Sequence, residues 1–471
     1  MRWVLSFLIF SLSFVDGFTE IRLGKHLEKK EFGDLDQLYE RRYFKVLTNK
    51  NSLNYFLHNG KQRGFQYEML RLFQNEINKK FKLGPNDIKI QFEVIPVAKK
   101  DLIPKLINGE GDIIASGMDS ELNNLPGVSY SAPYKKVKEV LVLRKGVDPN
   151  ELQESEILRS ELRREKSSFE KNVLNRLSPI LNYFMSGHLV PLKIDKQMDE
   201  ESEEIMMELV SRGKYKAAYI RSDYAELGIQ AYNNLEIKET SSSKDINISW
   251  AVRSTDVQLL EAINMFIPRV KQGSFMGNIL INKYFEELQV IKDEGFDLGQ
   301  HQISKYDKYI KEYSELYDLD WRLMAALCFQ ESRFNQDIKN EWGAIGLFQV
   351  KQSTANEPYI NITEIEGKYN YENNIHAGIK YLYWIKKTYF DEYEGMSEKN
   401  KVRMAIASYN AGPNRIRSAI RLAKEMGLDH LKWFRNVELA LIKMKKTEPV
   451  QYVSEINKRY VSYQLLGVEP F

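Results

Sequence analysis

The chain has 471 residues, of which 43% are hydrophobic and 28% charged, and its 68 Lys and Arg exceed its 65 Asp and Glu by a net charge of +3. This length predicts two to four domains, and the composition is that of ordinary globular proteins, which excludes a collagen-like fibre, wholesale disorder and many membrane spans. The net charge is small and no basic run lies between aromatic residues, so nucleic acid is not an expected partner. The chain has one cysteine and six scattered histidines, which excludes a disulfide framework and predicts neither a metal site nor a cofactor.

The N-terminus has the pattern of a signal peptide. Arg2 is followed by an apolar run from Trp3 to Val15, which Asp16 and Gly17 end. Because a membrane span needs about 20 apolar residues, we expect residues 1–17 to direct export and to be removed. An uncleaved N-terminal anchor is the alternative. In either case the rest of the chain, which starts with a charged lead-in over 18–42, is expected to work in the periplasm, with peripheral attachment to the outer membrane left open.

Residues 43–288 alternate between short apolar runs and helical periodicity, as α/β domains do. Strands are predicted over 43–47, 88–95, 112–115, 137–143, 192–194, 217–220 and 249–252, and helices over 67–81, 102–107, 203–211 and 257–271. The charged stretch 150–171 is predicted to be a solvated helix that crosses between two lobes. Two α/β units in tandem predict a cleft between them, a common place for a ligand.

A linker is predicted over 289–304, and strand patterns disappear after it, so residues 305–471 are predicted to be mainly helical. Asp318 and Asp320 are candidate caps for a helix that runs from Trp321 to Gln330 and reaches Glu331.

Glu331 stands at the end of an apolar helix face, because Met324, Leu327 and Cys328 precede it by seven, four and three positions. Burial there disfavours the ionised carboxylate and raises its pKa, as a general acid near neutral pH requires. The plainer interpretation is a helix-terminal glutamate that reaches solvent. Cys328 itself is interpreted as a small buried residue and not as a nucleophile, since no histidine accompanies it in a recognisable pattern.

Four motifs follow one another along this helical part. They are Glu331-Ser332, Gly346-Leu347-Phe348-Gln349, Ala407-Ser408-Tyr409-Asn410 and a late helix that carries Tyr452. Each motif is weak alone, but the four in this order resemble the family 1 lytic transglycosylases, whose catalytic domain has a goose-type lysozyme-like fold. Phe348 departs mildly from the Met or other apolar residue usual at its position.

The resemblance implies that Glu331 is the catalytic acid and base. It would protonate the glycosidic oxygen between N-acetylmuramic acid and N-acetylglucosamine, and then take the proton of the muramic C6 hydroxyl as that oxygen closes on C1. The product would be a 1,6-anhydro sugar, formed without water. Hydrolysing glycosidases use two carboxylates, whereas these motifs contain no second acid; Asp337, Glu341 and Glu357 are nearby candidates that we interpret as surface charges.

The remaining motif residues are implied to bind the substrate. Gln349 and Asn410 would hydrogen-bond sugar or N-acetyl groups, or else serve as turn or cap residues. Tyr409 would pack under the sugars or orient the acid, or else be a core aromatic. The hydroxyl of Tyr452 would approach the catalytic glutamate, and Ser332 would fix the acid or the substrate unless it caps its helix.

The front domain resembles the family 3 periplasmic solute-binding proteins, two-lobed (type II) proteins that bind amino acids between their lobes. The resemblance is carried by the segments 64–68, 106–114 and 129–134. The family's arginine for the ligand carboxylate has no counterpart in 117–124, so a bidentate clamp is not expected. Asp223 matches the acid that meets the ligand's α-amino group, or else it is a surface or capping residue. An amino acid or a muropeptide is the expected ligand, if the module binds one.

Together these patterns predict a multidomain protein, α/β followed by mainly α, that cleaves the β-1,4 bond of peptidoglycan glycan strands without hydrolysis. Its front domain would sense a ligand. Two alternatives remain: a non-catalytic cell-wall glycan or muropeptide receptor with a degenerate catalytic fold, and a lysozyme-like hydrolase with a second carboxylate. The enzyme is favoured because binding alone does not need an acid at the end of an apolar stripe.

Overall fold

The computed structural model describes residues 25–49, 51, 53–84, 87–120, 125–158, 203–239, 245–286 and 302–466. The predicted signal peptide 1–17, the strand predicted at 192–194 and most of the stretch 150–171 and of the linker 289–304 lie outside the described residues. Among the helices of the described ranges, none is long and apolar enough to cross a membrane.

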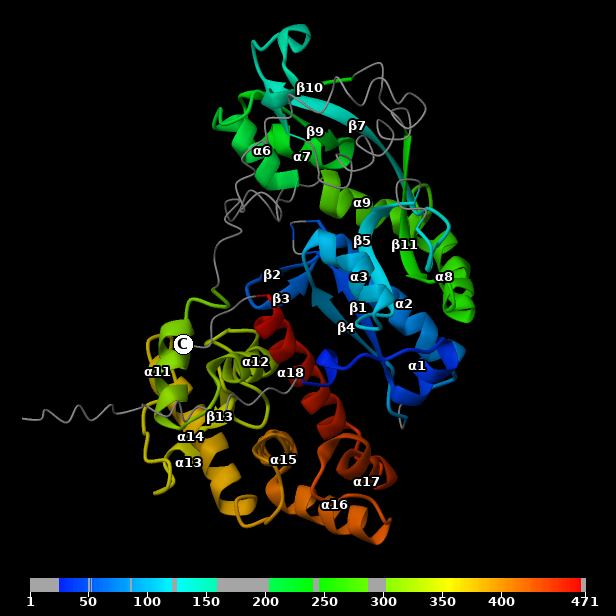
Figure 1. Ribbon diagram of the computed structural model, residues 1–471. Helices are drawn as coiled ribbons and strands as arrows, with labels where there is room; N and C mark the ends of the chain where they lie inside the picture. Colours follow the sequence, from blue (N-terminus) through cyan, green and yellow to red (C-terminus); the bar gives the residue numbers. More distant parts are fainter. Residues whose placement is uncertain are drawn as a thin grey trace, which may run out of the picture.

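A nine-stranded sheet organises the front domain (Figure 1). Its order is β4-β1-β5-β11-β7-β9-β8, with β6 added beside β11 and β10 beside β7. The strands are β1 Tyr43–Thr48, β4 Gln91–Pro96, β5 Ile113–Asp119, β6 Val128–Tyr130, β7 Lys135–Arg144, β8 Ile157–Leu158, β9 Ala217–Arg221, β10 Leu235–Lys238 and β11 Asp245–Arg253. β1 pairs in parallel with β4 and β5, whereas β11 pairs antiparallel with β5 and β7. The long strands β7 and β11 therefore connect a lobe around β1 with a lobe around β9.

Helices cover this sheet. They are α1 Leu35–Arg41, α2 Phe65–Lys80, α3 Leu102–Ile107, α6 Glu203–Ser211, α7 Ser222–Ala231, α8 Val257–Val270 and α9 Phe275–Ile281, with a small hairpin of β2 Phe56–His58 and β3 Lys61–Arg63. The predicted apolar face of α2 is buried in the front core, where Phe73 packs between Trp250 and Phe266. α1 begins at a full capping box on Asp34, and Leu38 is completely buried in the same core.

The charged stretch from residue 150 differs from the predicted helix where it is described. It holds two single 3₁₀ turns, Pro149–Glu151 and Glu154–Glu156, and then β8, which pairs in parallel with β9. Asp148 caps the first turn through the N–H of Asn150, and Pro149 fixes its first residue. The apolar side chains of Ile157 and Leu158 are stabilised more by burial in the sheet than they would be in a solvated, charged helix.

The second domain packs helices around a core of its own. They are α11 Asp307–Leu316, α12 Trp321–Ser332, α13 Gln352–Ala355, α14 Tyr371–Tyr389, α15 Glu398–Ala411, α16 Pro413–Glu425, α17 Glu438–Lys443 and α18 Glu448–Leu465, with a short turn η7 Trp433–Val437 before α17. The expectation that strands vanish here is wrong at one place, where β12 Ala344–Ile345 and β13 Val350–Lys351 form a small antiparallel hairpin.

Helix α18 belongs to the second domain but also contacts the front domain, and it lies between α12 and β4 in Figure 1. The hydroxyl of Tyr463 donates to the Gly60 carbonyl at 2.7 Å, and Gln62 donates to the hydroxyl of Ser462 at 2.5 Å. A third bond runs from Arg435 to the carbonyl of Glu40. The two domains are thus joined by specific polar contacts from α18 and from the turn η7.

Candidate active site

Helix α12 places Glu331 in its last turn. The carboxylate of Asp320 caps its start by accepting from the N–H of Arg322 at 2.9 Å, as the sequence predicts. The helix ends where Arg333 turns left-handed, with φ of 53°, and donates its N–H to the carbonyl of Phe329. Because a helix C-terminus carries partial negative charge, it adds to the forces that disfavour an ionised carboxylate at this point.

The environment of Glu331 gives its carboxyl group an unusual pKa. Burial against the apolar face raises the pKa of Glu331 to about 7, while a hydrogen bond from the Tyr452 hydroxyl lowers it in part. Tyr452 comes from the first turns of α18 and is itself buried. A carboxyl group with this pKa exchanges a proton readily near neutral pH, so it can act as an acid and then as a base.

The hairpin β12–β13 carries Gln349 in its turn, and the buried side chain of Asn374 holds the hairpin in place. Asn374 donates to the carbonyl of Ile345 and accepts from the N–H of Phe348, both at 2.9 Å. Position 346, which lies against Asn374, requires glycine. Its φ is 74°, and a Cβ there would lie 2.6 Å from the Asn374 amide nitrogen. The side-chain amide of Gln349 donates to the Gly346 carbonyl at 2.9 Å, so one of its hydrogen bonds stabilises the turn.

Gln336 and Asn374 are positioning residues that sequence reasoning missed. Gln336 accepts from the N–H of Leu347 at 3.2 Å and donates to the carbonyl of Gly367 at 3.1 Å. Amides of this kind show no pattern in the sequence, and Asn374 directly follows the polar residues Glu372 and Asn373, so nothing in the sequence marks its role.

Tyr409 and Asn410, at the end of α15, face the same hairpin. The Tyr409 hydroxyl donates to the carbonyl of Phe348 at 2.8 Å, and its ring lies 5.2 Å from that of Tyr381. Asn410 donates to Glu448 at 3.4 Å, while its Oδ1 is buried with no hydrogen-bond partner among the described residues. This oxygen is therefore a ready acceptor for an N–H group of a ligand.

Two neighbours of Glu331, Ser332 and Cys328, are buried within the protein. The buried hydroxyl of Ser332 donates to the carbonyl of Cys328 at 3.2 Å, inside its own helix. Burial raises the pKa of the Cys328 thiol well above its usual value, so it is not a thiolate nucleophile. Direct contact between Ser332 and a substrate stays a prediction.

Among the described residues, no other carboxylate contributes to the pKa shift of Glu331. Asp337, Glu341 and Glu357 are all exposed, as expected of surface charges. Throughout the described ranges, no cluster of three His, Cys, Asp or Glu side chains has the arrangement of a metal site.

Asp223, the candidate ligand residue of the front domain, is buried and paired with two cations. Arg221 donates to its carboxylate at 2.6 Å and Lys135 at 3.2 Å, and although burial opposes them, these cations hold the pKa of Asp223 below its usual value. Arg221 also donates to the carbonyl of Gly117 in the other lobe at 2.9 Å. An α-amino group would have to displace Lys135, so this role of Asp223 stays a prediction.

Comparison with known proteins divides the chain in the same way. Residues 44–287 match the model of bacterial extracellular solute-binding proteins, family 3, and residues 308–431 match the transglycosylase SLT domain. These matches confirm the predicted fold class, a binding-protein-like α/β domain followed by a helical domain. Tyr452 lies beyond the second match.

Relatives of similar architecture cover most of the chain. Membrane-bound lytic murein transglycosylase F of Desulfosudis oleivorans is 25% identical, over 82% of this chain and 80% of its own. The protein of the same name from Pseudomonas fluorescens is 24% identical, over 93% of this chain and 88% of its own. Among solved structures, holo ArgBP from T. maritima is 19% identical and aligns with 53% of this chain and 99% of its own, with a TM-score of 0.36.

Proposed function

We propose that this chain, which belongs to the membrane-bound lytic murein transglycosylase F family, cleaves peptidoglycan glycan strands with Glu331 as its only catalytic carboxylate. The family joins a family 3 solute-binding domain to a transglycosylase SLT domain and acts on peptidoglycan. The observation that carries the finer proposal is the carboxyl group of Glu331, raised in pKa to about 7 and hydrogen-bonded by Tyr452.

The proposed reaction uses one carboxyl group twice. Glu331 first gives its proton to the glycosidic oxygen between N-acetylmuramic acid and N-acetylglucosamine, and the bond from C1 to that oxygen breaks. The C6 hydroxyl oxygen of the muramic residue then bonds to C1, and its proton passes to the Glu331 carboxylate. The carboxyl group is restored, a 1,6-anhydro ring is formed, and no water is consumed.

The neighbouring residues have separate roles in this proposal. The hydroxyl of Tyr452 orients the carboxylate and stabilises its ionised form between the two proton transfers. The buried Oδ1 of Asn410 accepts from the N–H of an N-acetyl group, and Gln349 contacts a sugar at the hairpin. Tyr409 holds the hairpin through the carbonyl of Phe348 and so positions Gln349.

We further propose that the front domain binds a small ligand, an amino acid or a muropeptide, and regulates the catalytic domain. The names of the relatives describe them as membrane-bound, and we propose that this chain works in the periplasm at a membrane surface. The residues that would hold a ligand include Asp223, which must then exchange one of its two cations for the ligand.

The decisive experiment is mass spectrometry of the soluble products after incubation of purified sacculi with the protein. Wild-type protein should release anhydro-muropeptides, and Glu331→Gln should release none, while the matched surface variant Glu341→Gln should behave as wild type. Products heavier by one water, with reducing ends, would instead identify a hydrolase with a second carboxylate. Binding of glycan without products from either protein would favour the receptor.

A further inference from the structure

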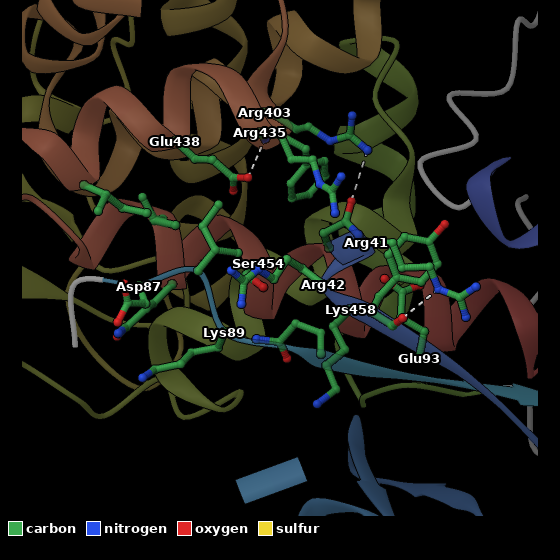
Figure 2. A pocket seen from close by; sticks show the side chains of 18 of the residues that line it. Arg41, Arg42, Asp87, Lys89, Glu93, Arg403, Arg435, Glu438, Ser454 and Lys458 are labelled. Carbon is green, nitrogen blue, oxygen red and sulfur yellow. Dashed lines mark hydrogen bonds between the residues drawn. The ribbon is translucent and has the colours of Figure 1, made fainter. Parts of the chain in front are cut away.

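A cavity of about 440 Å³ lies between the two domains, apart from Glu331 (Figure 2). The lead-in, β1 and β4 line one wall, and α15, η7, α17 and α18 line the other. On α18 the lining residues include Gln451, Ser454 and Lys458, which share one helix face. At 3.6 residues per turn, Tyr452 points to roughly the opposite side of the helix, so the cavity is a site distinct from the one that holds the catalytic acid.

Positive charge exceeds negative charge around this cavity, because seven basic and four acidic residues line it. Four of the cations, Arg42, Lys89, Arg435 and Lys458, have no carboxylate at ion-pair distance within the described part of the chain. The side chains of two of them donate to neutral carbonyls, Lys89 to Leu83 and Gly84 and Arg435 to Glu40.

The other two uncompensated cations lie against aromatic rings. The guanidinium of Arg42 lies 3.9 Å from the ring centroid of Tyr39, and its Nη1 is buried without a hydrogen-bond partner. The ammonium of Lys458 lies 5.9 Å from the ring centroid of Tyr67. Both cations therefore retain donors for an anion that enters the cavity.

The acids of the lining are already engaged. Glu31 accepts from the hydroxyl of Tyr43 at 2.7 Å and pairs with Lys45 at 3.4 Å, and Asp87 accepts from the N–H of Gly84 at 2.7 Å. Glu438 is buried and accepts from the N–H of Arg435, and its burial raises its pKa to about 7. Glu93, the fourth acid, interacts electrostatically with Arg403 and Lys458. Seven basic residues against four acidic ones still leave a positive excess in the lining.

A buried polar wall and an apolar part complete the site. Arg403 is only 6% exposed and donates to the side chain of Asn457 at 3.3 Å, and Figure 2 shows it beside Arg435 and Glu438, with Lys89 and Lys458 across the cavity. Apolar side chains also line the space, among them Ile88, Ile442 and Val450. The volume falls within the range of about 300–1,000 Å³ that is typical of small-molecule sites.

We propose that this interdomain cavity binds a small extended dianion, a molecule with an acidic group at each end and an apolar middle. The uncompensated cations stand on both domains, so the two acidic groups bridge the walls, while the apolar side chains cover the middle. Guanidinium groups bind carboxylates in a bidentate fashion, which favours carboxylates as the acidic ends. The site needs no involvement of Glu331 and does not depend on the reaction proposed above.

The test is isothermal titration calorimetry of the full chain with pimelate, whose two carboxylates are joined by an apolar chain. Pimelate should bind, and Arg435→Gln and Lys458→Gln should each weaken binding by about tenfold or more. Lys387→Gln removes an equal charge from an exposed position on α14 and should leave the affinity unchanged. Ser454→Phe fills the cavity without a change of charge and should abolish binding.

Several results would overturn the proposal. Absence of heat with wild-type protein would do so, as would equal binding by Lys458→Gln, which loses no hydrogen bond to the described residues and is expected to fold. Inorganic pyrophosphate, a compact anion of higher charge density, serves as the ligand in a second titration. If pyrophosphate bound more tightly than pimelate, the site would select charge density and not an extended ligand with an apolar middle.

Discussion

The hydrogen bond from Tyr452 to Glu331 gives a prediction that separates a catalytic pair from a chance contact. Tyr452→Phe removes the hydroxyl and keeps the ring, which is buried in the core between α12 and α18. A hydrogen bond to a charged group contributes about 1.5–3 kcal/mol, and one pH unit corresponds to about 1.4 kcal/mol. Because the site is partly open to solvent and water replaces some of this bond, we take the lower limit, a change of about one pH unit.

The sign of this change follows from which form the bond favours. The hydroxyl donates to the ionised carboxylate, so its loss raises the pKa of Glu331 above about 7. Since the first step needs the protonated form, activity falls as the pH rises through this pKa. The alkaline limb of the rate profile should therefore move to higher pH by about one unit in Tyr452→Phe.

The assay is the initial rate of anhydro-muropeptide release from sacculi, measured by liquid chromatography and mass spectrometry from about pH 5 to about pH 9. Tyr369→Phe, at an 84% exposed tyrosine, is the matched control and should keep the wild-type profile. An alkaline limb that stays in place, or that moves to lower pH, would refute the assignment of Tyr452 as the partner of the acid.

Three further predictions concern stability. Asn374→Ala leaves the Ile345 carbonyl and the Phe348 N–H without partners, so calorimetry should show a loss of about 2–4 kcal/mol, whereas Asn373→Ala beside it should change little. Asp223→Asn leaves two buried cations poorly compensated and should destabilise the front domain by about 3–5 kcal/mol, as a drop in only one of two thermal transitions. Glu331→Gln should raise stability at pH 8 by roughly 3 kcal/mol, since the pKa differs by about 2.5 units at about 1.4 kcal/mol each, and leave it unchanged near pH 4. The reason is that the folded carboxyl group, with a pKa of about 7, resists the ionisation that the unfolded one undergoes near its ordinary value of 4.5. An equal gain at both pH values would contradict this linkage.

The regular elements were predictable because their patterns are local. The periodicity that predicts a helix over 67–81 corresponds to α2 within two residues at each end, and the helix predicted over 102–107 coincides with α3. The strand predicted from Ile88 begins only at Gln91, since register is set by the neighbouring strand β1 and not by the alternation of β4 itself. The short hairpin at 344–351 was missed because its two-residue strands are stabilised from outside. The amides that stabilise it are those of Gln336, 8 residues before the hairpin, and Asn374, 23 residues after it.

The candidate site was predictable to the extent that a motif names its residues. Glu331 and Tyr452 are 121 positions apart, and no periodicity links them, so only the resemblance to a family predicted their meeting. The interdomain cavity had no precedent in that resemblance. Its cations come from segments near residues 42, 89, 435 and 458, and none of these segments is basic enough alone to attract attention.

The demands that the proposed reaction makes on a single carboxyl group are met by an apolar helix face and one hydroxyl. A carboxyl group that must first give a proton and then regain one is useless if either form is strongly favoured. A surface glutamate with an ordinary pKa would be almost entirely ionised at neutral pH and would seldom have a proton to give. Burial against Leu327 and its neighbours without the Tyr452 bond would hold the proton too firmly. The two opposing forces leave the pKa of Glu331 at about 7, and this balance makes a second carboxylate unnecessary when the attacking oxygen belongs to the substrate itself.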